Sequence, residues 1–124
     1  MRPIKLRAYD KNKSFNKMSY AKIEHFDDML GFRFEHFESE PEDLVFMQYT
    51  GCEDRKGQGI YEGDIIKEYT TEDEYFLTEV IYTKGCFMGK EPGYDPEYPI
   101  YDFSGGEVIG NIYENPELLG GKYV

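Results

Sequence analysis

The stretch from residue 44 to residue 66, LVFMQYTGCEDRKGQGIYEGDII, decides the expected fold. Its first part, Leu44 to Thr50, is rich in apolar, β-branched and aromatic residues, which favours a β-strand. A charged run flanked by glycines follows, and this composition is typical of a hairpin connection. Ile60-Tyr61 resumes the extended pattern, Glu62-Gly63-Asp64 predicts a kink, and Ile65-Ile66 opens the next strand. The stretch therefore predicts three short strands joined by a polar loop and a kink.

Four segments of the chain resemble a known family. MQYTG (47–51) and IYEGDII (60–66) resemble the signature of the YopX family of phage and prophage proteins, IKLRAYD (4–10) resembles its opening strand, and EVIGNIYENPELL (107–119) resembles its closing segment. The chain departs from the family pattern at Gln58 and Ile66, where a charged residue and Val are commoner, and in an insert around residues 85–105. The resemblance implies a fold and a phage or prophage context. The family has no established biochemical activity, so the resemblance implies no catalytic residues.

The composition predicts one folded domain over residues 1–124, with an N-terminal meander (1–40) and a barrel portion (44–119). A chain of 124 residues with 40% hydrophobic and 17% aromatic content can bury one core, and disordered chains are poor in aromatic residues. No apolar run approaches the ~18 residues of a membrane span and no signal-peptide pattern is present, so we expect a cytoplasmic protein of a bacterial host. Cys52 and Cys86 lack a CxxC or zinc-ligand spacing and are predicted to be free thiols.

The charge argues against binding of free nucleic acid. The chain has 25 acidic and 14 basic residues, a formal net charge of −11, and such a surface repels phosphate backbones. Some basic residues do gather near the N-terminus: Arg2, Lys5, Arg7, Lys11, Lys13, Lys17 and Lys22. We interpret them as solvent-facing positions of a hairpin rather than as a patch for nucleic acid or an acidic partner.

The first forty residues predict a β-meander. Residues 4–10 alternate, with Ile4, Leu6 and Ala8 facing inward and Lys5, Arg7 and Tyr9 facing outward, and residues 15–20 form the return strand. Residues 22–38 support two interpretations. We prefer strands at 22–26 and 32–37 with a turn between them, whereas a short amphipathic helix over 22–30 is the alternative.

The second half of the chain predicts further strands at 65–70, 75–83 and 108–113. Large side chains occupy both faces of the 75–83 strand, which is typical of a strand that is central or at an interface. The segment 85–106 is rich in Pro and Gly and predicts a short strand at 86–88 followed by a long loop, whose order the sequence leaves open. Asn115-Pro116-Glu117 has the chemistry of a helix start, with Asn as the cap.

No residue pattern predicts a catalytic, cofactor-binding or metal site. His25 and His36 lie among carboxylates, but 25 acidic residues place a carboxylate near almost any His, and Cys52 and Cys86 have no local nucleophile signature. Asp64 is expected to accept backbone N–H groups at a turn. The residues expected to hold the structural motif are Gly51, Tyr61, Gly63, Asp64 and Gly110.

The tyrosines are the candidates for partner binding. The chain has 12 Tyr and no Trp, and exposed Tyr is enriched at protein interfaces. Tyr94, Tyr98 and Tyr101 in the 85–106 loop are the candidate partner-binding residues, although they could instead fold back over the core.

These patterns lead to one expected fold and three hypotheses for function. The fold is mainly β (β-rich α+β), a small, partly open, SH3-like barrel with an N-terminal meander and a short C-terminal helical turn. The leading hypothesis is a non-enzymatic protein-binding module of phage or prophage origin. We expect it to form a homo-oligomer through the 75–83 strand or the 85–106 loop. The alternatives are an acidic DNA-mimic decoy for a host nucleic-acid-binding protein, and an enzyme of a kind that the motifs do not reveal.

Overall fold

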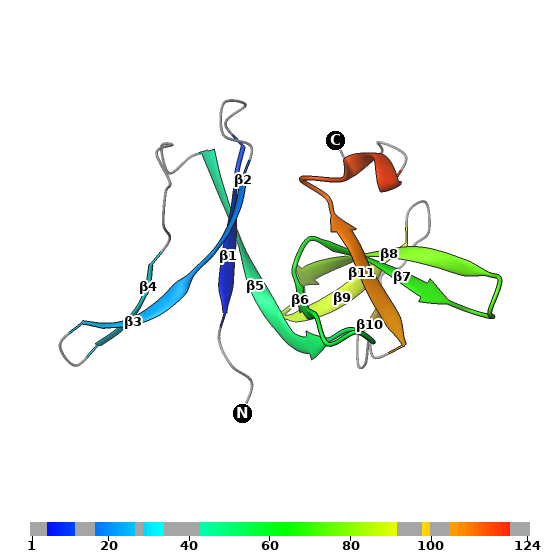
Figure 1. Cartoon of the computed structure of the whole chain (residues 1–124), viewed down its shortest axis with the longest axis horizontal. Helices are drawn as coiled ribbons and strands as arrows, with labels where there is room; N and C mark the ends of the chain where they lie inside the picture. The colour runs from blue at the N-terminus through cyan, green and yellow to red at the C-terminus, as the bar shows by residue number, and fades with distance from the viewer. Residues whose placement is uncertain are drawn as a thin grey trace. The chain divides into compact units, whose positions relative to one another are not determined.

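The described part of the chain is mostly β-strand. Its computed structural model describes residues 5–11, 17–26, 29–33, 43–91, 98–99 and 105–119 (Figure 1). The chain divides into two compact units, Met1–Gln48 and Tyr49–Val124, and the boundary falls inside one long strand, β5 (Leu44–Glu53). The expected mainly β fold class is confirmed. The extent of a single domain over residues 1–124 stays a prediction.

The first unit contains a three-stranded antiparallel arrangement and a separate hairpin. β1 (Leu6–Asp10) pairs with β2 (Lys17–Tyr20) along one edge and with the first half of β5 along the other. β3 (Lys22–Phe26) pairs with β4 (Met29–Arg33) in a two-stranded sheet of their own. The described part of this unit thus consists of the hairpins β1–β2 and β3–β4 with the first half of β5 beside β1, and a meander over residues 1–40 stays a prediction.

The structure decides between the two interpretations of residues 22–38. The helix over 22–30 is wrong, because Phe26 pairs with Met29 and Lys22 pairs with Arg33 across an antiparallel hairpin. The strand at 22–26 is correct in its bounds. The second strand begins at Met29 rather than at residue 32, because only Asp27 and Asp28 separate the two strands and a two-residue connection is the shortest common hairpin loop.

The predicted alternation along the first strand is also corrected. Arg7 and Tyr9 were expected to face outward, yet only 2% and 5% of their surface is exposed, and Ala8 and Asp10 are buried as well. β1 has hydrogen-bonded neighbours on both edges, in the order β2-β1-β5. The alternation of polar and apolar residues in the sequence does not reveal such burial on both faces.

The second unit is a curled five-stranded antiparallel sheet with a hairpin against it. The strand order is β10-β9-β8-β7-β11. The bounds are β7 Asp64–Tyr69, β8 Tyr75–Thr83, β9 Cys86–Lys90, β10 Tyr98–Pro99 and β11 Gly106–Asn111. The second half of β5 pairs with β6 (Gly59–Tyr61) to form the hairpin. The expected small, partly open barrel is confirmed in the form of this curled sheet.

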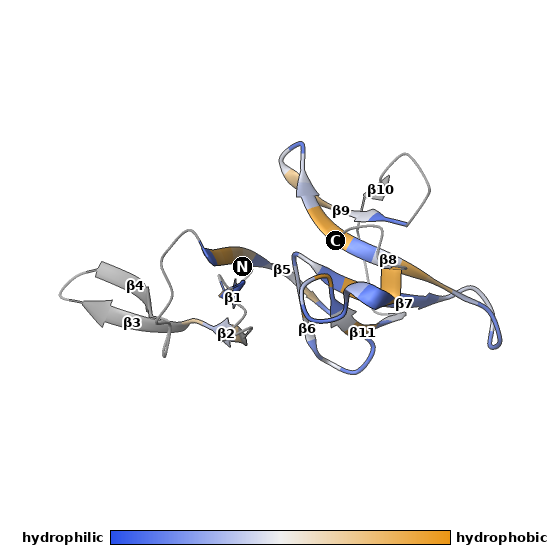
Figure 2. Ribbon diagram, turned by 90° about the horizontal axis from the view of Figure 1, so that it is seen from above, coloured by the Kyte–Doolittle hydropathy of each residue, from blue (hydrophilic) through white to orange (hydrophobic). Residues whose placement is uncertain are grey.

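The core of the second unit lies between the sheet and this hairpin. Ile60 of β6 packs against Ile66 of β7 and Val80 of β8, and all three are fully buried. Cys52 and Val108 pack against this cluster. β8 is the middle strand of the sheet, as one of the two interpretations of its sequence predicted, and its central residues Thr78, Glu79 and Val80 are buried. Figure 2 shows that the β7–β8 turn, at the far right, is hydrophilic.

The C-terminal segment ends in one short helical turn, as expected. The 3-10 helix η2 spans Pro116–Leu119. Asn115 does not cap this helix with its side chain, because its Oδ1 accepts the backbone N–H of Asn111 at 3.2 Å. The predicted Asn cap is therefore wrong, since the amide side chain closes the preceding turn instead.

Candidate functional site

The loop between β5 and β6 is fastened to the outer edge of β11 through one buried carboxylate. Asp54 Oδ1 accepts the backbone N–H groups of Lys56 and Gln58, each at 2.9 Å, and Asp54 Oδ2 accepts that of Val108 at 2.9 Å. Next to it, the Arg55 N–H donates to the carbonyl oxygen of Gly106 at 2.9 Å. These bonds satisfy two groups on the outer edge of β11, the Val108 N–H and the Gly106 carbonyl, so the first half of this edge is covered.

The ionisation of Asp54 suits this role. Burial acts to raise the pKa of Asp54, but the three backbone N–H donors and the charge of Lys56 outweigh it, so the pKa lies below the usual value. Lys56 itself is exposed and forms an ion pair with Glu107 of β11, with Nζ and Oε1 2.7 Å apart. The loop is thus held by hydrogen bonds of its backbone and by the charges of Asp54 and Lys56. Because Arg55 belongs to this anchored loop, the anchorage also positions the Arg55 side chain.

A cation–aromatic cluster lies where this loop meets the end of β7. We use this name for Arg55, Lys67, Tyr69 and Tyr75. The Arg55 guanidinium lies 5.5 Å from the centre of the Tyr69 ring. Lys67 Nζ lies 5.2 Å from the Tyr69 ring and 4.2 Å from the Tyr75 ring. The two rings face each other across β7 and β8 with an edge-to-face geometry and a centroid distance of 6.4 Å.

The β7–β8 turn beside this cluster is acidic and has a fixed backbone. We call its tip, Glu72–Glu74, the acidic turn. Thr71 Oγ1 accepts the backbone N–H groups of Asp73 and Glu74, and the Thr70 N–H donates to the carbonyl oxygen of Glu74 at 2.9 Å. These bonds involve only threonines and backbone atoms, so the acidic side chains are not needed to hold the turn. All three acidic side chains are exposed.

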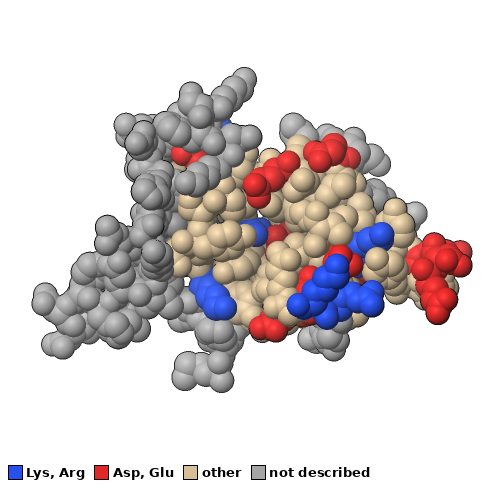
Figure 3. Space-filling model, in the orientation of Figure 1, with Lys and Arg blue, Asp and Glu red and all other residues tan. Residues whose placement is uncertain are grey.

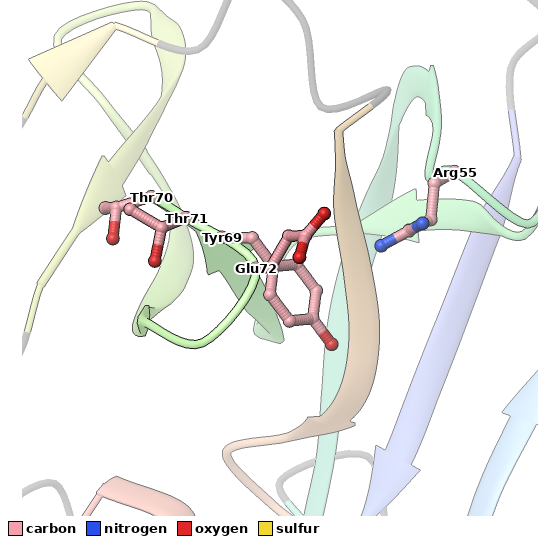
Figure 4. Close-up of a pocket in the computed structure, with 5 residues that line it drawn as sticks. All are labelled: Arg55, Tyr69, Thr70, Thr71 and Glu72. Atoms are coloured by element: carbon pink, nitrogen blue, oxygen red, sulfur yellow. The ribbon is translucent and has the colours of Figure 1, made fainter.

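Part of the cluster and the first residues of the turn between β7 and β8 line an open pocket of roughly 530 Å³. Its lining residues are Arg55, Tyr69, Thr70, Thr71 and Glu72. In Figure 4 the Tyr69 ring lies in the middle, the Glu72 carboxylate lies beside it, and Arg55 points toward it from the neighbouring loop. One wall of the pocket is therefore cationic and aromatic, and its rim is acidic.

The charges of this pocket are not neutralised within the described part of the chain. Arg55 and Lys67 have aromatic contacts but no carboxylate partner there, although Glu107, directly across from Lys67, is paired with Lys56. The acidic turn has no basic partner among the described residues either. On the face seen in Figure 3, acidic atoms gather at the tip of the β7–β8 hairpin and basic atoms gather beside it on the same unit.

The three candidate partner-binding tyrosines of the 85–106 loop are not part of the cluster as described. Tyr94 and Tyr101 lie outside the described residues. Tyr98 belongs to β10, where its backbone pairs with Gly89, and its side chain is likewise outside the description. The role of these three tyrosines in partner binding stays a prediction.

The motif residues of the second unit form its turns and close contacts. Gly51 and Gly63 adopt positive φ angles of 90°, which favours glycine. Asp64 is buried and its Oδ2 accepts the backbone N–H of Tyr61 at 2.8 Å, so it closes the kink between β6 and β7. Gly110 lies against Asn115, where an added Cβ would come within 2.5 Å of the Asn115 Oδ1.

No constellation for chemistry emerges from the described residues. Cys52 is half-buried, Cys86 is exposed, and both are free thiols, as expected. The described ranges contain no group of three or more His, Cys, Asp and Glu side chains that could hold a metal ion. The side chain of His25 and all of His36 lie outside the description.

The cation–aromatic cluster was not predicted from the sequence. A signal was available, because Lys67 and Tyr69 alternate onto one face of a predicted strand, and Tyr75 begins the strand after a four-residue turn. Antiparallel pairing then places Tyr75 opposite Tyr69. The contribution of Arg55 had no such signal, since it depends on the anchorage of a distant loop to β11.

The fold and the pocket define a class, a small curled β-sheet protein with a mixed-charge aromatic surface. The chain belongs to the YopX family, since the family model described as "YopX protein" matches residues 4–120. Among solved structures, the chain is similar to the crystal structure of protein EF1440 from Enterococcus faecalis, with 25% sequence identity and a TM-score of 0.63. That match covers 96% of this chain and 99% of the other. No curated protein matches the chain.

The described helical content bears on membranes in one respect. In the part of the chain that the structure describes, no helix has the length and apolar character needed to cross a membrane.

Proposed function

We propose that the protein is a non-enzymatic protein-binding module that self-associates. The observation that carries this proposal is the exposed aromatic surface of the β7–β8 hairpin and the strand end beyond it. Tyr69 and Tyr75 pair on one face of this hairpin and keep 38% and 56% of their surface exposed, whereas Tyr82, on the other face of β8, keeps 49% exposed. Tyr offers large apolar area with a polar tip, which makes it a frequent residue at interfaces. A phage or prophage origin and a cytoplasmic location belong to the same proposal.

The faces of the sheet are better suited to binding than its edges. One edge, β11, is partly covered by the Asp54 carboxylate, which accepts the Val108 N–H, and by the Arg55 N–H, which donates to the Gly106 carbonyl. The strand at the other end, β10, contains Pro99, which has no N–H to donate to a partner strand. We therefore place the interface on side chains of β7 and β8 rather than on an added strand.

Light scattering coupled to size exclusion tests the proposal. At tens of micromolar protein and ~150 mM salt, where the screening length is ~8 Å, we expect a mass above the 14.6 kDa of one chain. The double variant Tyr69→Ser, Tyr75→Ser should shift the protein toward the monomer, because both rings lie on the same face of the hairpin. Tyr20→Ser is the matched control, because Tyr20 is 54% exposed but belongs to the first unit. A monomeric wild-type protein would contradict self-association.

An acidic decoy is the second candidate, and the exposed acidic turn is the observation that favours it. A protein that presents carboxylates in place of DNA phosphates should bind its target with a steep salt dependence. Capture of a host nucleic-acid-binding protein at ~50 mM salt and its loss at ~200 mM would support the decoy. Binding through tyrosines should change little over that range.

A further inference from the structure

We propose that the pocket between the cation–aromatic cluster and the acidic turn is a self-complementary interface for a second copy of this chain. The cations Arg55 and Lys67 of one copy would bind the acidic turn of the other copy, and the reverse contact would form at the same time. This inference rests on the proposed self-association and adds its surface, its partner and its symmetry.

The first argument is the presence of both charges in one patch. Arg55 and Glu72 line the same pocket, and they have no ion pair with each other or with another described residue. A dimer with two-fold symmetry uses the same surface patch on both copies, so that patch must be complementary to itself. A patch that is cationic on one side and acidic on the other meets this requirement.

The second argument concerns the donors that remain on the cations. The Arg55 guanidinium contacts the face of Tyr69, and the structure gives its N–H groups no acceptor among the described residues. A guanidinium presents five N–H donors whose geometry fits a carboxylate. With 25 acidic residues in the chain, cations that stay without a carboxylate are available for one from outside.

In both halves of the patch the backbone is already held by hydrogen bonds. The acidic turn is fixed by hydrogen bonds to Thr71 Oγ1, and the Arg55 backbone is fixed by its bond to Gly106. Groups that are already ordered lose less conformational entropy when they bind. The exposed rings of Tyr69 and Tyr75 add the apolar area that ion pairs at a protein surface lack.

The net charge of the whole molecule bears on which partner this pocket would bind. A net charge of −11 repels polyanions and other copies at long range, so only a local match of charge can favour association. Glu72 in the pocket rim also disfavours a small free anion. A second copy supplies both a carboxylate for the cations and cations for Glu72.

Charge reversal tests this arrangement. Reversing the cations with Arg55→Glu and Lys67→Glu should raise the dimer dissociation constant about tenfold or more, because like charges then face each other. These changes also shift the net charge from −11 to −15, so the control is Lys5→Glu with Lys11→Glu, which reaches the same net charge at exposed positions of the first unit. The control should weaken the dimer much less. Arg55→Glu alone, on an exposed loop, serves if the double variant fails to fold.

The opposite reversal separates local pairing from net charge. The triple variant Glu72→Lys, Asp73→Lys, Glu74→Lys reduces the magnitude of the net charge from −11 to −5, which by itself would strengthen association. The inference expects weaker self-association instead. Added salt is a poorer test, because it screens the long-range repulsion as well as the local attraction.

Mixing the two reversed proteins gives the decisive measurement. The cation-reversed copy and the turn-reversed copy should each be monomeric alone and form a one-to-one heterodimer together, as measured by light scattering or sedimentation. A wild-type dimer that keeps its affinity in both variants would overturn the inference while self-association stands. A mass that grows without limit as concentration rises would overturn the two-fold arrangement, and a wild-type monomer would overturn both proposals.

Discussion

The carboxylate of Asp54 and the backbone N–H of Val108 are separated by 54 positions in the chain and joined by a hydrogen bond of 2.9 Å. The same carboxylate accepts two further N–H groups from its own loop. This one side chain therefore orders the β5–β6 loop, covers part of the edge of β11 and sets the position of Arg55 in the pocket.

The first prediction concerns the stability that Asp54 provides. Asp54→Ala should lower the free energy of unfolding by about 2–4 kcal/mol, because three backbone N–H groups lose a charged acceptor. Urea unfolding measures the change. Asp73→Ala, an exposed aspartate in the acidic turn, is the matched control and should stay within about 0.5 kcal/mol of the wild type. An equal loss in both variants would show that the hydrogen bonds of Asp54 do not matter.

The second prediction concerns acid. The pKa of Asp54 in the folded protein lies below the ordinary value of 3.8, although burial opposes this, because the backbone N–H donors and Lys56 stabilise the ionised form. The stabilisation by Asp54 is thus complete above pH 3.8 and is lost as the pH falls through the folded-state pKa. The difference in unfolding free energy between wild type and Asp54→Ala should therefore be constant from pH 7 to pH 4 and shrink below that. A difference that stays unchanged at lower pH would contradict the assignment.

The third prediction has the opposite sign and concerns Glu79. Burial in the middle of β8 raises the pKa of Glu79 above 4.5, and the charge of Lys90 opposes this only in part. The folded protein then binds more protons than the unfolded chain between pH 4.5 and the raised pKa, so stability falls as the pH rises through that pKa. Glu79→Gln should remove this part of the pH dependence and be no less stable than the wild type at pH 7.

Unfolding curves between pH 5 and pH 8 test the role of Glu79. Glu74→Gln is the matched control, because Glu74 is exposed in the acidic turn. If Glu79→Gln and wild type had parallel stability profiles over this range, the raised pKa would not contribute to stability.

The fourth prediction concerns the contact between Gly110 and Asn115. A Cβ at position 110 would lie 2.5 Å from Asn115 Oδ1, the atom that accepts the Asn111 N–H. Gly110→Ala should therefore cost about 1–3 kcal/mol of unfolding free energy. Gly105→Ala, where an added Cβ would meet no atom within 4 Å, is the control. In the double variant Gly110→Ala, Asn115→Ala the overlap is removed, so the two losses should be less than additive.

The fifth prediction concerns nucleic acid. Free duplex DNA should not bind at low micromolar protein in ~150 mM salt, because the net charge of −11 repels the phosphate backbone. The basic cluster near the N-terminus is also smaller than the sequence indicates, since Arg7 is buried. A clear shift in a gel assay that is lost on Lys5→Glu with Lys11→Glu would refute this prediction.

The sequence by itself determined the strands whose patterns are local. The bounds of β8 follow from its extended pattern and from the polar turn that precedes it, and the Gly63-Asp64 kink follows from its turn chemistry. These features depend on neighbours within a few residues along the chain. Local sequence is sufficient wherever the hydrogen-bond partner is equally local, as with Asp64 and the Tyr61 N–H.

Only the tertiary structure decided which edges and faces are covered. The burial of Arg7 is not indicated by the alternation along β1, and the role of Asp54 depends on Val108, far along the chain. In the same way, Tyr69 meets Lys67 and Tyr75 through hairpin periodicity but meets Arg55 only because the loop is anchored to β11. Alternation along a strand determines which side chains share a face, whereas the element that covers that face depends on contacts between distant segments.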